Sequence, residues 1–111
     1  MAEDLSILRE PDWLLKFEAQ ARKDFELAGA SSCLPVLDTG SLEALQACFR
    51  NAVLELESKQ LLPNLLYRID LTEKQVSDAV RSQPGKAVPE VLAELMIKRL
   101  LQKVVLKEWY K

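Results

Sequence analysis

The sequence predicts an all-α fold, a compact bundle of four to five helices with a long C-terminal helix. Leucine supplies 21 of the 111 residues, whereas aromatic residues make up only 6%. Apolar residues recur at spacings of three and four in several segments, as they do on one face of an α-helix. Residues that cap or start helices, such as Ser41, Thr72 and Pro89, stand at the edges of these segments. We expect a single helical domain over residues 1–111, with a frayed N-terminus at 1–10.

The first helix is expected to begin at Pro11, which suits the first helical position, and to end at Gly29. Its apolar face consists of Leu14, Phe17, Ala21, Phe25 and Ala28. Residues 30–40 contain small residues and a proline, which predict a connecting loop. Because residues 33–37 are too apolar to extend freely into water, we expect them to lie across the bundle.

The second helix is expected to begin after Ser41, a good N-cap residue, with Glu43 in its first turn where the helix dipole favours an acid. Its apolar positions at helical spacing are Leu42, Leu45, Phe49, Ala52, Val53 and Leu56. Pro63 interrupts this helix or starts another. Residues 65–71 fit both a helical and an alternating strand pattern, and we favour the helix because a lone strand would have no partner.

A short helix is predicted over residues 73–82. Thr72 and Gln75 form a capping box, in which each side chain satisfies a free backbone N–H group. The inner face of this helix consists of Val76, Ala79 and Val80. Residues 82–85 end the helix, since they contain both a proline and a glycine.

The last helix is expected to run from Pro89 to Trp109, and it is too apolar to bury all its apolar residues on one face. Between Pro89 and Tyr110, thirteen of 22 residues are apolar. At about 100° per residue they form two arcs. The first arc consists of Ala93, Met96, Ile97, Leu100, Leu101 and Val104, and the second of Val91, Leu95, Leu106 and Trp109. We expect the second arc to be an association surface for a homodimer or a partner protein; the alternative is burial within the same chain.

The last helix also carries a basic ridge, defined as Arg99, Lys103, Lys107 and Lys111, at steps of four residues. Like charges at this spacing repel each other, so one hypothesis is that the ridge binds an anion or a nucleic-acid backbone. We favour the simpler interpretation that these cations complement the helix dipole and keep the surface soluble.

The composition excludes several classes of chemistry. The chain contains no histidine, which removes Ser-His-Asp catalysis, Cys-His catalysis and histidine-ligated zinc. It has no phosphate-binding glycine motif, and Cys33 and Cys48, fifteen residues apart, make a poor metal site. We expect these cysteines to be buried thiols, although the sequence leaves open whether Cys33 is reactive. No catalytic residue, metal or cofactor is therefore expected.

The charge distribution argues against a general nucleic-acid-binding protein. The net charge is −2, but the two halves of the chain differ in sign. Residues 1–57 contain eleven acids and five bases, a charge of −6, and residues 58–111 contain six acids and ten bases, a charge of +4. A domain that is negative at one end and positive at the other suits protein association better than nucleic-acid binding. The sequence has no secretory signal pattern and no apolar run that would span a membrane, so we expect a cytoplasmic location.

These observations predict a small non-enzymatic protein that acts through association with other proteins, as an adaptor, an assembly factor or a dimeric scaffold. The alternative is an anion- or nucleic-acid-associated module that uses the basic ridge.

Overall fold

The computed structural model describes residues 8, 10–37 and 40–109, which form five α-helices and one short 3₁₀ helix and contain no strand. These elements are α1 (Pro11–Leu27), η2 (Ser31–Cys33), α2 (Leu42–Ser58), α3 (Leu62–Arg68), α4 (Glu73–Ser82) and α5 (Val88–Trp109). The all-α prediction with a long C-terminal helix is confirmed. The expectation of a frayed N-terminus concerns residues 1–10, of which only residues 8 and 10 are described.

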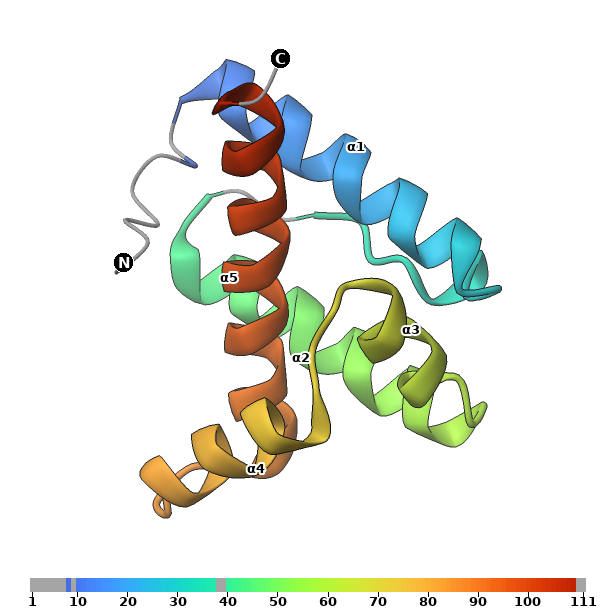
Figure 1. Ribbon diagram of the computed structural model, residues 1–111, viewed down its shortest axis with the longest axis vertical. Coiled ribbons are helices and arrows are strands. Elements are labelled where there is room, and N and C mark those ends of the chain that lie inside the picture. The colour runs from blue at the N-terminus through green and yellow to red at the C-terminus, as the bar shows by residue number, and fades with distance from the viewer. Residues whose placement is uncertain (1–7, 9, 38–39, 110–111) are drawn as a thin grey trace.

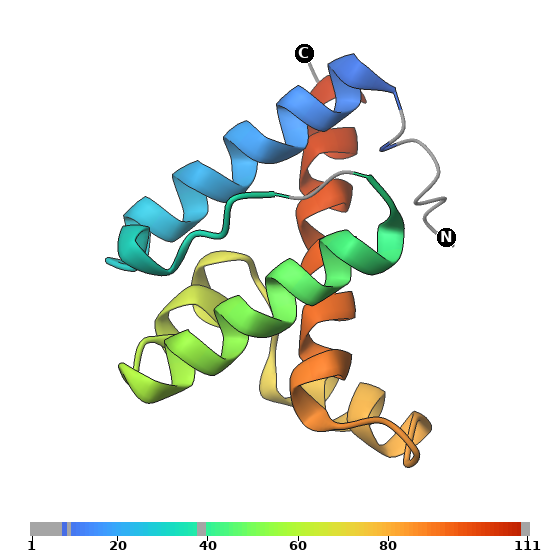
Figure 2. The same cartoon turned by 180° about the vertical axis from the view of Figure 1, so that it is seen from behind.

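Helix α5 is the central element, against which α1, α2 and α4 all pack. Helices α1 and α2 cross one side of α5 (Figure 2). The connecting segment 69–72 runs from α3 to α4 on the opposite side, and α4 lies against the first turns of α5 (Figure 1). The start of α1 lies near the end of α5, so these two helices run in roughly opposite directions.

The core lies between α5 and the inner faces of α1, α2 and α3. Phe17 of α1 and Phe49 of α2 are fully buried and meet edge to face, with their ring centroids 5.9 Å apart. The predicted apolar faces of α1 and α2 are buried except for Leu14, which is half-buried, and Leu42, which is exposed. Leu42 is the first residue of α2, and the helix begins at the molecular surface. The spacing of apolar residues therefore predicted the burial of Leu42 incorrectly.

The helix ends follow the predicted capping residues. Ser41 Oγ accepts a hydrogen bond from Ala44 N at 3.0 Å at the start of α2. At the start of α4, Thr72 Oγ1 accepts from Gln75 N at 3.1 Å while Gln75 Oε1 accepts from Thr72 N at 2.9 Å, as the capping box predicts. After α1, Gly29 has φ +73°, a left-handed conformation that glycine adopts without steric cost.

The ambiguous segment 65–71 is helical in its first part and a turn in its second. Helix α3 ends at Arg68, and Asp70 then has φ +62°. The strand alternative is therefore wrong. Aspartate is one of the residues that tolerate this left-handed backbone conformation, which turns the chain toward α4.

The segment after α1 lies over the core, as predicted. Cys33 is buried, and Leu34 and Leu37 are partly buried and pack against the core. Val36, in contrast, is 94% exposed. Among the residues described, no helix is both long and apolar enough to cross a membrane.

Candidate functional site

The two arcs of α5 have different environments. All six residues of the first arc are buried, and all except Val104 belong to the main hydrophobic core. The second arc is divided along the length of the helix. Val91 is fully buried and Leu95 is partly buried, whereas Leu106 is 44% exposed and Trp109 is 76% exposed.

Helix α4 lies against the first turns of α5, at the buried end of the second arc. Val91 is buried although it is not part of the main hydrophobic core, and α4 packs against this part of α5. Val91 therefore cannot belong to a surface that contacts another molecule, and Leu95 can contribute only in part. The predicted association surface is reduced to Leu106 and Trp109.

A groove that the sequence did not reveal lies between α3 and α4. Its volume is about 990 Å³. Both apolar and polar residues line it. The lining apolar side chains that are buried or partly buried are Leu62, Leu66, Leu71 and Val76. Tyr67 also lines the groove and is 80% exposed.

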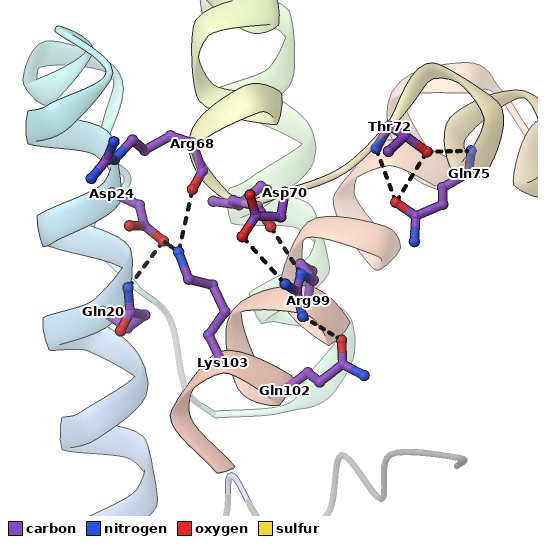
Figure 3. A network of polar contacts seen from close by, with 10 residues as sticks. Gln20, Asp24, Arg68, Asp70, Thr72, Gln75, Arg99, Gln102 and Lys103 are labelled. Atoms are coloured by element: carbon purple, nitrogen blue, oxygen red, sulfur yellow. Dashed lines mark hydrogen bonds and ion pairs between the residues drawn. The ribbon is translucent and has the colours of Figure 1, made fainter. Parts of the chain in front are cut away.

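The three ridge residues that the structure describes each donate to an acceptor within the molecule, and Figure 3 shows this for Arg99 and Lys103. Lys103 Nζ lies 2.8 Å from Asp24 Oδ2 on α1 and donates to the carbonyl oxygen of Arg68 at 3.3 Å. The Asp24 side chain is only 2% exposed. A buried carboxylate needs a cation of this kind, so Lys103 has a structural role.

Arg99, one helical turn before Lys103, holds the turn between α3 and α4. Its Nε donates to the carbonyl oxygen of Ile69 at 2.9 Å, and one Nη donates to Gln102 Oε1 at 2.6 Å. The other Nη lies 3.4 Å from Asp70 Oδ2. Arg99 thus fixes the position at which the backbone of Asp70 turns.

Of the three ridge residues that the structure describes, Lys107 is the one that has no ion-pair partner among the described residues. Its Nζ donates to Gln20 Oε1 at 2.6 Å. Burial, followed by the nearby positive charges of Lys23 and Lys103, lowers the pKa of Lys107 from its ordinary value, and Asp24 offsets this only in part. Lys111 lies outside the described residues.

Gln20 and Asp24 of α1, to which the sequence pattern assigned no role, are both buried. Gln20 Nε2 donates to Asp24 Oδ2 at 3.1 Å, which joins Lys107, Gln20, Asp24 and Lys103 into one network. A signal was present in the sequence, since Gln20 and Asp24 project close to the same helical face as Phe17 and its apolar neighbours.

A second cleft, of about 170 Å³, lies between α2 and α5 and has charged walls. Four of its five charged residues are paired: Arg50 lies 3.8 Å from Glu90, and Lys86 Nζ lies 3.1 Å from Glu94 Oε2. Glu43 is the fifth charged residue of the lining. Within the described part of the chain, no three histidine, cysteine or acidic residues are grouped closely enough to hold a metal ion.

Neither Cys33 nor Cys48 forms a disulfide. Cys33 is 2% exposed, and Cys48 is partly exposed and donates to the carbonyl oxygen of Val36 at 3.5 Å. The expectation of buried thiols therefore holds fully for Cys33 and only in part for Cys48.

Comparison of this chain with models of known protein families, with curated proteins and with solved structures found no match.

Proposed function

We propose that this protein acts by binding another protein, and that the groove between α3 and α4 receives an amphipathic segment of that partner. The observation that carries the proposal is the groove itself, with apolar side chains from two helices in a cavity of about 990 Å³. An amphipathic helix that lays its apolar face into such a groove is a common mode of peptide recognition.

The charges around the groove indicate the chemistry of the partner segment. Asp70 and Lys103 line the groove, but each is in an ion pair, with Arg99 and Asp24 respectively. Arg68 also lines the groove and is exposed. Its guanidinium has no ion pair with a carboxylate among the described residues. Glu73 also lines the groove, is exposed, and has no ion pair among the described residues. A segment with an acidic residue that faces Arg68 and a basic residue that faces Glu73 would therefore match the groove.

Tyr67 is the residue best placed to anchor such a segment. It lines the groove and is largely exposed, and tyrosine is enriched among the residues that contribute most to binding energy at protein interfaces. The lack of histidine further supports a binding role over a catalytic one, since it removes the commonest general base.

The experiment is a selection of helical peptides from a displayed library against the full chain, followed by fluorescence anisotropy with the selected peptides. We expect apolar peptides with at least one acidic residue, and we expect Tyr67→Asp and Arg68→Glu each to weaken binding by about tenfold or more. The matched control is Val36→Asp, which adds the same charge at an exposed residue outside the groove. The proposal is wrong if no peptide is selected, or if the selected peptides bind the groove variants as well as the control.

A second candidate is self-association through Leu106 and Trp109. The exposure of a tryptophan and a leucine on the same arc of α5 favours it. Sedimentation velocity at several concentrations tests this candidate, because Leu106→Glu should dissociate a dimer formed through this surface. A sedimentation coefficient that does not change with concentration would exclude it.

A further inference from the structure

We propose that a cleft between α1 and α5 binds a phosphate dianion, either as inorganic phosphate or as the phosphate group of a small monoester. This site is separate from the groove between α3 and α4 and does not depend on the proposed function.

The cleft has a volume of about 230 Å³, below the range of about 300–1,000 Å³ that is usual for drug-sized ligands. This size suits a small ion. Its walls come from one face of α1 and the last turns of α5. The lining residues are Lys16, Ala19, Gln20, Lys23, Val104, Lys107 and Glu108.

The charges in the cleft do not balance. Lys16 Nζ is paired with Glu108 Oε1 at 3.2 Å. Lys23 and Lys107 have no carboxylate within ion-pair distance among the residues described. The neighbouring carboxylate of Asp24 is engaged by Lys103. Lys23 and Lys107 therefore line one small cleft, and neither is in an ion pair with a carboxylate of the described residues.

The positive charges near Lys107 repel its own charge. Burial is the main cause that lowers the pKa of Lys107, and the positive charges of Lys23 and Lys103 add to it, which means that they oppose its protonated form. Gln20 accepts a hydrogen bond from Lys107 Nζ but contributes no negative charge. An anion between Lys23 and Lys107 would remove this repulsion.

Phosphate matches the cleft in both charge and hydrogen bonding. A phosphate monoester carries a charge of about −1.5 to −2 at pH 7, which balances two ammonium groups. Its oxygens accept several hydrogen bonds, and each lysine ammonium has three donors. A singly charged carboxylate would neutralise only one of the two lysines.

The test is a titration of the full chain with inorganic phosphate and, separately, with phenyl phosphate, followed by amide NMR at constant ionic strength adjusted with chloride. We expect saturable shifts in the last turns of α5 and the middle of α1. Lys23→Gln with Lys107→Gln should weaken binding by about tenfold or more, since the double variant removes both positive charges and their hydrogen bonds to the anion. Binding of both probes would indicate that the cleft accepts esters, and binding of inorganic phosphate alone would indicate a site for the free ion.

The matched control is Lys74→Gln with Lys98→Gln, which removes two lysines that do not line the cleft. Lys23→Arg with Lys107→Arg keeps both charges and should retain binding. Circular dichroism establishes that each variant is folded before titration. The proposal is overturned if the folded wild-type chain shows no saturable shift with either probe, or if the cleft variant and the control bind equally well.

Discussion

Replacement of Lys103 by methionine should lower the free energy of unfolding by about 3–5 kcal/mol, the cost of removing one partner of a buried ion pair. The side chain of Asp24 is 2% exposed, and its Oδ2 accepts from Lys103 Nζ at 2.8 Å and from Gln20 Nε2 at 3.1 Å. Without Lys103, the buried carboxylate keeps one neutral donor on that oxygen. Methionine retains most of the length of the lysine side chain, so the loss reflects the missing charge more than missing packing.

The size of this effect distinguishes a buried pair from a surface pair. Exposed ion pairs contribute about 0–1 kcal/mol, whereas a loss of about 3–5 kcal/mol is a large fraction of the roughly 5–15 kcal/mol that stabilises a typical domain. Urea unfolding followed by circular dichroism measures the loss as a lower transition midpoint at unchanged slope.

The double variant Asp24→Asn with Lys103→Met serves as the control. Asparagine removes the buried charge but keeps an oxygen that accepts from Gln20, so the double variant should be more stable than Lys103→Met alone. Our reasoning fails if Lys103→Met costs less than about 1 kcal/mol, or if the double variant is no more stable than the single one.

Three further predictions concern other parts of the structure. Thr72→Ala breaks the capping box and should cost about 1 kcal/mol, with faster amide hydrogen exchange confined to α4; unchanged exchange in α4 would contradict this. Phe49→Ala should cost about 3–5 kcal/mol in urea unfolding, because Phe49 is fully buried against Phe17. The lowered pKa of Lys107 means that the unfolded chain binds more protons than the folded chain as the pH approaches 10.5 from below. The contribution of Lys107 to the free energy of unfolding therefore rises with pH in that range. Urea unfolding of the wild type and of Lys107→Met at pH 8 and at pH 10.5 measures this. The midpoint of the wild type relative to that of the variant should be higher at pH 10.5 than at pH 8.

The parts of the fold that depend on local interactions could be predicted from the sequence. The hydrogen bonds of Thr72 with Gln75 and of Ser41 with Ala44 join residues three positions apart, so the residue types alone predict them. The first arc of α5 was also predicted correctly, because an aliphatic face at helical spacing is buried wherever the neighbouring helices lie.

The ion pairs, the second arc of α5 and the groove depend on contacts between segments that are distant in the sequence. The sequence alone could not predict these contacts. The partner of Lys103 is Asp24, 79 positions earlier in the chain, and no local pattern links them. The division of the second arc depends on where α4 docks, which the spacing of Val91 and Leu95 cannot indicate. The groove beside Tyr67 exists because Asp70 turns the chain with a positive φ, and the sequence pattern left this segment ambiguous.

The central position of α5 has a consequence for biosynthesis. Helix α2 packs most extensively against α5, and α1 also packs against it, yet α5 is the last of these helices to be translated. While the nascent chain is still short of Val88, α1 and α2 lack the helix against which both pack. The core between these helices can therefore close only after α5 has been translated.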